Sequence, residues 1–79
     1  MAWVYILCSS SGRYYIGSTE NLERRLREHK RGSNQTTHRL GELTLVAAKE
    51  MPSIAEARGL EIHLKKKKNP RLAIFVLNS

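Results

Sequence analysis

The chain has 79 residues and 41% hydrophobic residues, which suits one small globular domain and excludes an intrinsically disordered protein. Its single cysteine excludes an internal disulfide framework and a cysteine-based zinc site. Fourteen Lys and Arg against seven Asp and Glu give a net charge of +7, which favours a polyanionic partner such as nucleic acid over a role for the lysines in solubility alone.

The hydrophobic residues do not form a membrane segment. Residues 1–8 are apolar, but no basic segment precedes them. They are too short for a membrane span and wrongly flanked for a signal peptide. We therefore expect a single domain over residues 1–79, in the cytoplasm and without a membrane partner.

Two strands are predicted at the start of the chain. Residues 3–9 and 13–18 are rich in aromatic and branched side chains, a composition typical of strands. The three residues between them end in Gly12, which fits a hairpin loop whose last residue is left-handed.

The loop length sets the pairing of the two strands, because a shift of one residue would exchange the faces of the second strand. It puts Leu7 opposite Tyr15, and Tyr5 opposite Gly17. One face then carries Trp3, Tyr5, Leu7, Tyr15 and Gly17, and the other carries Val4, Ile6, Cys8, Tyr14 and Ile16. We predict that Tyr14 serves packing and that a side chain at position 17 would crowd the hydroxyl of Tyr5.

The following elements alternate between helix and strand. Residues 21–31 predict a helix that ends at Gly32, and residues 43–48 predict a third strand. A second helix starts at Ser53, where a capping-box pattern occurs, and runs to about residue 68.

The apolar tail, residues 72–77, is too short to distinguish a strand from a short helix. The order of elements indicates an α+β domain with helices against a small, mainly antiparallel sheet.

Three ionisable residues occupy helix positions where a core pattern prefers apolar side chains: Arg25, His29 and Glu61. A buried charge is costly without a partner, so each needs a counter-charge, water or a ligand. One interpretation places Arg25 and Glu61 at the rim of the core, or pairs them with each other. The other assigns them to a functional site with the tyrosines.

Hydrolysis of a phosphodiester requires residues of these types. A group must activate water, and a cation must neutralise the developing charge. A tyrosine hydroxyl can transfer a proton, arginine matches phosphate oxygens, and one carboxylate suffices to hold a hydrated Mg²⁺. The spacing of the residues leaves open whether they converge.

Three segments together resemble the GIY-YIG nuclease superfamily. Residues 3–5 (WVY), followed nine residues later by 15–17 (YIG), are similar to its two-part signature. Residues 21–29 resemble the first helix of its small standalone members, which are related to the N-terminal nuclease domain of an excinuclease. Residues 56–65 resemble the metal-binding helix of the family.

The resemblance implies a three-stranded antiparallel sheet flanked by helices and hydrolysis of DNA with one divalent ion, Mg²⁺ or Mn²⁺. Tyr5 and Tyr15 correspond to the tyrosines near the attacking water, either of which is a candidate general base. Arg25 corresponds to the arginine that holds the scissile phosphate, Glu61 to the metal ligand, and His29 to a position with a catalytic role in some members. A role in DNA repair or recombination follows by analogy alone.

Basic residues around this group are candidates for contacts with the DNA backbone. They are Arg24, Arg27, Lys30 and Arg31 near the first helix, His38 and Arg39 beside Thr37 in the next loop, and Lys65 in the second long helix. Of the run Lys65–Lys68, we expect only one or two to face a partner, because four successive helical residues point in different directions.

The sequence departs from the family at two positions of interest. Ser18 stands where several members carry a catalytic lysine, and Ala73 where the excinuclease domain has an asparagine. A nucleic-acid-binding module with little or no catalysis is therefore the alternative to a nuclease, and a protein adaptor is a third hypothesis. Either DNA-directed function would take its targeting from a protein partner.

Overall fold

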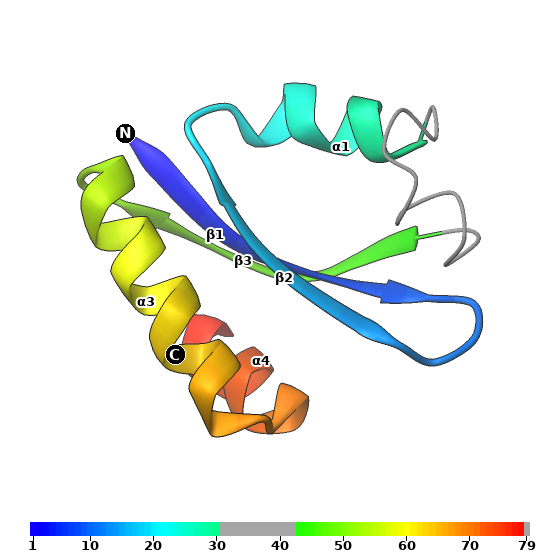
Figure 1. Ribbon diagram of the computed structural model, residues 1–79. Helices are drawn as coiled ribbons and strands as arrows, with labels where there is room; N and C mark the ends of the chain where they lie inside the picture. Colours follow the sequence, from blue (N-terminus) through cyan, green and yellow to red (C-terminus); the bar gives the residue numbers. More distant parts are fainter. Residues whose placement is uncertain (31–42, 79) are drawn as a thin grey trace.

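The computed structural model describes residues 1–30 and 43–78, with side chains described at 1–28 and 43–78. Its elements are β1 (Ala2–Ser9), β2 (Tyr14–Thr19), α1 (Leu22–Lys30), β3 (Leu43–Met51), α3 (Ile54–Lys67) and α4 (Pro70–Asn78). The sheet has the order β2-β1-β3, and both outer strands run antiparallel to β1 (Figure 1). This architecture confirms the predicted α+β fold.

The hairpin of β1 and β2 has the predicted register. Tyr5 pairs with Gly17, and Leu7 pairs with Tyr15. In the loop, Gly12 has a φ of 86°, a left-handed conformation that glycine adopts without a steric penalty. The alternation along β1 and β2 therefore follows from the loop length, as expected.

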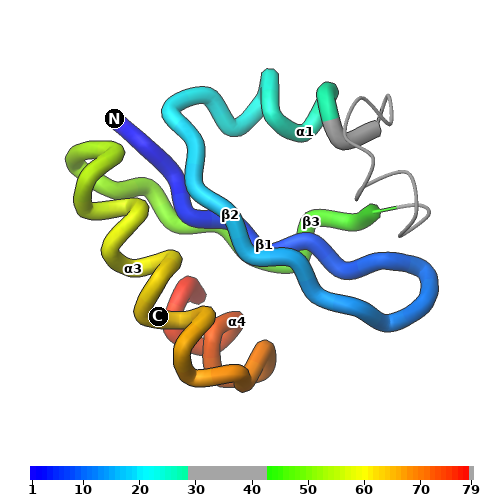
Figure 2. Tube along the Cα trace, in the orientation of Figure 1, coloured from blue at the N-terminus to red at the C-terminus, as the bar shows by residue number. Residues whose placement is uncertain are grey.

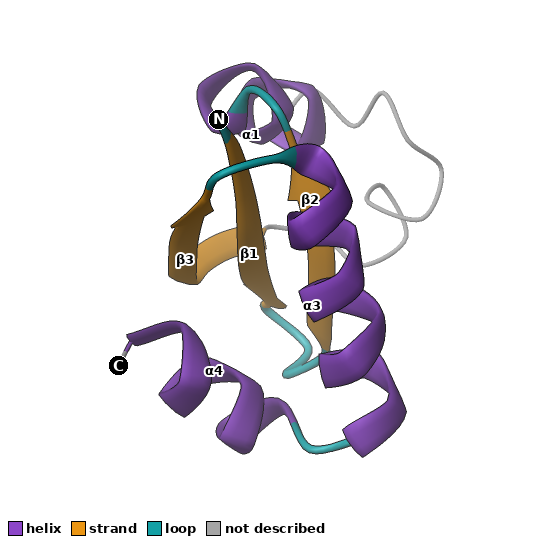
Figure 3. Ribbon diagram, turned by 90° about the vertical axis from the view of Figure 1, so that its left-hand side faces the viewer, coloured by secondary structure: helices purple, strands orange, loops and turns teal. Residues whose placement is uncertain are grey.

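The two faces of the sheet carry different helices. α3 and α4 cover one face, whereas α1 lies on the other side (Figures 1 and 3). The core between the sheet and the first pair consists of Ala2, Val4, Ile6, Ala47, Ala57, Leu64, Ala73 and Leu77. The intervening residues Tyr5 and Leu7 are each 1% exposed, so β1 is buried on both faces.

The ends of α3 have clear local causes. The hydroxyl of Ser53 accepts a hydrogen bond from the backbone N–H of Glu56 at 3.2 Å, which confirms the predicted helix start. At the other end, Lys68 adopts a left-handed conformation and its N–H donates to the carbonyl of Lys65. α3 thus ends one residue before Asn69-Pro70, where the sequence predicts a stop.

Three details differ from the sequence-based predictions or extend them. The third strand continues three residues beyond Ala48, to Met51, whose pairing with Ala2 places the N-terminus beside the turn into α3 (Figure 2). The tail forms a helix, α4, rather than a strand.

Tyr14 is 41% exposed, so its prediction as a packing residue is wrong. It is the first residue of the edge strand β2, where the helices leave its ring open to solvent. Within the described residues, no helix is long and apolar enough to span a membrane.

Candidate active site

Tyr5 and Gly17 form the closest contact of the site. A Cβ atom built on Gly17 would lie 2.5 Å from Oη and 2.6 Å from Cζ of Tyr5. No side chain fits at such distances, so the glycine is required by the tyrosine ring. The predicted crowding of the Tyr5 hydroxyl by any larger residue is confirmed.

Arg25 reaches Tyr5 from α1 on the opposite side of the sheet from the main core. Its Nε donates to Oη of Tyr5 at 3.3 Å, and its Nη1 donates to Oε2 of Glu28 at 3.2 Å. The interpretation that pairs Arg25 with Glu61 is therefore wrong. The Arg25 side chain is 38% exposed, and a guanidinium has five N–H donors, so donors remain for a phosphate.

Glu61 projects from α3 toward β2, and its side chain is 18% exposed. Its Oε1 accepts from the hydroxyl of Ser18 at 2.5 Å, and its Oε2 accepts from Nζ of Lys65 at 2.7 Å. Both carboxylate oxygens are thus held. Ser18 is a site residue that sequence reasoning missed, because it was considered only as the absence of a lysine.

Electrostatic coupling connects these groups. Burial raises the pKa of Tyr5 above its ordinary value of 10.0, the hydrogen bond and charge of Arg25 oppose this rise, and Tyr15 and Glu61 add to it. The pKa of Arg25 is raised, mainly by the hydrogen bond with Tyr5. Tyr5, Tyr15, Arg25 and Glu61 therefore share one electrostatic neighbourhood, and Tyr5 is a neutral phenol near pH 7.

The site fits a hydrated hard cation and does not fit zinc. Among residues 1–28 and 43–78, no three His, Cys, Asp or Glu side chains come together, so a closed zinc site is excluded from this part of the chain. A single carboxylate with water ligands suits Mg²⁺ or Mn²⁺. Glu61 is such a carboxylate, and its hydrogen bonds with Ser18 and Lys65 fix its orientation.

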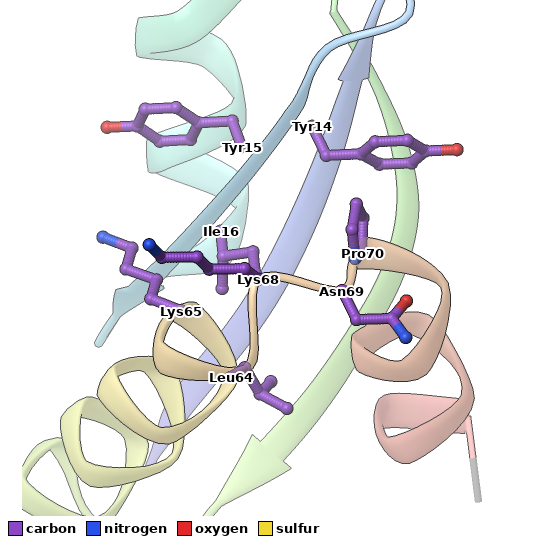
Figure 4. Close-up of a pocket in the computed structure, with 8 residues that line it drawn as sticks. All are labelled: Tyr14, Tyr15, Ile16, Leu64, Lys65, Lys68, Asn69 and Pro70. Atoms are coloured by element: carbon purple, nitrogen blue, oxygen red, sulfur yellow. The ribbon is translucent and has the colours of Figure 1, made fainter.

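Two hollows flank Glu61 along α3. One contains Ser18, Arg24 and Arg58, and the other contains Lys65 and Lys68 together with the tyrosines at the start of β2 (Figure 4). Arg58, Glu61, Lys65 and Lys68 are three or four residues apart, so they lie along one side of the helix. Arg58 is a further cation that the sequence analysis missed, and this helical spacing from Glu61 would have been the signal.

The other predicted DNA contacts have mixed placements. Arg24 and Arg27 are exposed on α1, and Arg24 forms an ion pair with Glu28 at 3.5 Å. His29 and Lys30 belong to α1, but their side chains lie outside the described residues, as do Arg31, Thr37, His38 and Arg39 entirely. Ala73, discussed above as a departure from the family, is 1% exposed in the core of the fold.

Residues 1–73 match the family model described as the GIY-YIG catalytic domain. The chain belongs to the GIY-YIG family. This family is a nuclease superfamily, and the match confirms the resemblance inferred from the two tyrosine segments and the helix that carries Glu61.

Within the GIY-YIG family, the chain is similar to two proteins of Streptococcus pneumoniae. It is 38% identical to a UPF0213 protein of serotype 4 (strain ATCC BAA-334 / TIGR4) over 77 residues, which cover 95% of this chain and 77% of that protein. It is 36% identical to UPF0213 protein spr1390 of strain ATCC BAA-255 / R6, with the same coverage. No solved structure matches the chain.

Proposed function

We propose that this GIY-YIG protein is a metal-dependent endonuclease that hydrolyses phosphodiester bonds of DNA. The observation that carries the proposal is the bond from Arg25 to Tyr5, formed over a glycine, with Tyr15 and Glu61 close enough to influence the same phenol. Such a group combines a cation, two hydroxyls and a carboxylate, which are the elements that phosphodiester hydrolysis needs.

Arg25 binds the scissile phosphate in this proposal. Its guanidinium is already oriented by Tyr5 and Glu28, so it loses little freedom when it donates to phosphate oxygens. Tyr5, a neutral phenol with a raised pKa, acts as a hydrogen-bond donor to the same phosphate.

Tyr15 is the better candidate for the general base, because it is only half buried whereas Tyr5 is 1% exposed. The oxygen of water bonds to phosphorus, the bond from phosphorus to the leaving sugar oxygen breaks, and Tyr15 in its phenolate form takes the proton of the water. The role of His29 stays a prediction.

Glu61 would hold the divalent ion, Mg²⁺ or Mn²⁺. When bound, that ion supplies positive charge beside the phosphate oxygens. Ser18 keeps one carboxylate oxygen in place, and Lys65 neutralises the other in the absence of the ion. A role in DNA repair or recombination, and a protein partner for targeting, complete the proposal by family analogy.

A non-catalytic DNA-binding module is the second candidate. It is favoured by the ion pair of Lys65 with Glu61, which occupies an oxygen that a metal would need. Ser18 in the place of a lysine points in the same direction.

Nicking of supercoiled plasmid in Mg²⁺ or Mn²⁺ tests the two candidates. We expect Glu61→Gln to lower the nicking rate at least about 100-fold, since it removes the proposed carboxylate ligand. Glu50→Gln changes the same charge at an exposed position of β3 and should keep the wild-type rate.

Binding without cleavage on supercoiled, branched and single-stranded DNA would support the binding module instead. Failure to bind any DNA at low salt would contradict both candidates, because phosphate contacts give salt-sensitive affinity.

A further inference from the structure

One hollow beside the site is used by none of the catalytic groups except Tyr15. It lies at the start of β2, where α3 ends and α4 begins, and has a volume of about 360 Å³ (Figure 4). Six of its lining residues matter for its chemistry: Tyr14, Tyr15, Lys65, Lys68, Asn69 and Pro70. This volume is in the range of small-ligand sites.

The hollow has a cationic end and an aromatic end. In Figure 4 the ammonium groups of Lys65 and Lys68 lie on the side of Tyr15, whereas the rings of Tyr14 and Pro70 lie on the other side of β2. The ring of Tyr14 is 41% exposed. Positive charge next to an exposed aromatic ring is the combination that binds one nucleotide by its phosphate and its base.

Lys68 has an unusual backbone conformation for its residue type. Its φ of 52° makes it the one non-glycine residue with positive φ in the described part of the chain. Helices commonly end in this conformation with glycine or asparagine, and other residues are strained there. The chain places lysine at this position, and within the described residues its ammonium forms no ion pair.

Lys65 connects the hollow with the catalytic carboxylate, because its Nζ lies 2.7 Å from Oε2 of Glu61. Lys66 and Lys67 do not line the hollow, although they carry the same charge. The run of four lysines thus divides into two that face the hollow and two that do not.

The geometry points to a nucleotide subsite in this hollow, next to the scissile phosphate. An unpaired nucleotide of the DNA strand binds with its phosphate at Lys65 and Lys68 and its base against the ring of Tyr14. This inference rests on the proposed function for its position along the strand. It implies a preference for DNA with single-stranded extensions or flaps over intact duplex, because a paired base cannot reach the ring.

Fluorescence anisotropy of labelled oligonucleotides, measured in EDTA to prevent cleavage, tests the subsite. The probes are a blunt duplex, the same duplex with a single-stranded extension, and the single strand. We expect Tyr14→Leu to weaken binding of the two probes with unpaired bases about 5- to 100-fold, and Tyr14→Phe to restore it. Binding of the blunt duplex should be unaffected.

Lys68→Gly provides a second variant that cannot fail by unfolding. Glycine relieves the left-handed strain, so the urea midpoint should rise while the affinity for the extended duplex falls roughly 3- to 10-fold. The slope of log affinity against log salt should fall by about one. Lys66→Gln removes the same charge outside the hollow and should have little effect.

Three results would overturn the subsite: wild-type binding by both Tyr14→Leu and Lys68→Gly, equal losses in Lys66→Gln, or equal losses on the blunt duplex. Plasmid nicking in Mg²⁺, measured separately, distinguishes this failure from failure of the proposed function. Nicking with unchanged binding in the variants refutes the subsite alone. Selective loss of binding in a wild-type protein that never nicks DNA refutes the nuclease and supports the subsite.

Discussion

Gly17 and Tyr5 can be tested as a pair. Gly17→Ala should lower the free energy of unfolding by about 1–3 kcal/mol, because the new methyl group would overlap the phenol. The loss should be smaller in a Tyr5→Leu background, where the overlapping Oη and Cζ atoms are gone. Urea denaturation of the four proteins measures this coupling.

Gly59→Ala is the matched control for that measurement. Gly59 lies within α3, and a Cβ built on it has nothing within 4 Å. Alanine should raise the free energy of unfolding there by about 0.5–1 kcal/mol. Equal effects at positions 17 and 59 would contradict the steric role of Gly17.

The raised pKa of Tyr5 predicts a loss of stability in alkaline solution. Above the ordinary value of 10.0, the unfolded chain loses the proton of Tyr5 while the folded chain retains it. The unfolded state then binds fewer protons, so the free energy of unfolding falls as pH rises. The stabilisation is complete below about pH 10 and declines as pH rises from there through the folded pKa.

The wild type should therefore lose stability relative to Tyr5→Phe between about pH 9 and 11 in urea titrations. The difference isolates Tyr5, because the lysines titrate equally in both proteins. A difference that stays constant over this range would show that the phenol is not held protonated.

At the scale of the elements, α3 supplies both the carboxylate and a lysine that competes with a metal ion for it. Lys65→Gln removes this competitor, so the affinity for Mn²⁺ should rise roughly 1.5- to 5-fold, the range expected for an exposed ion pair. Calorimetric titration of the protein without DNA measures the affinity. Lys66→Gln is the control, and an equal rise in both variants would point to net charge alone.

The hairpin could be predicted in detail, because loop length and side-chain alternation are local properties of the sequence. The start of α3 was equally local, since Ser53 and Glu56 are three residues apart. The bond between Ser18 and Glu61 joins residues 43 positions apart and depends on how α3 docks against β2. No local pattern encodes that contact, so the sequence did not reveal it.

The tail shows a signal that was present but not used. Oδ1 of Asn69 accepts a hydrogen bond from the N–H of Leu72 at 3.1 Å, and Pro70 is the first residue of α4. Asparagine followed by proline is typical of a helix start. We interpreted these residues only as the end of the preceding helix, although they begin the next one.

For the whole molecule, the charge of +7 predicts a strong dependence of DNA affinity on salt. Three phosphates neutralised by groups such as Arg25, Arg58 and Lys68 give a log–log slope of about −2.7, or about 40-fold weaker binding between 50 and 200 mM salt. Anisotropy in EDTA measures this slope. An affinity independent of salt would refute phosphate contacts as the basis of binding.

β1 gives its even-numbered residues Val4 and Ile6 to the core and its odd-numbered residue Tyr5 to the site. Inserting or deleting one residue within this strand would exchange the two sets and remove both the fold and the site. The parity of β1 is therefore a constraint on how its relatives can diverge in length. Changes in length should occur in the loop at residues 10–12, where they alter the turn and leave that alternation intact.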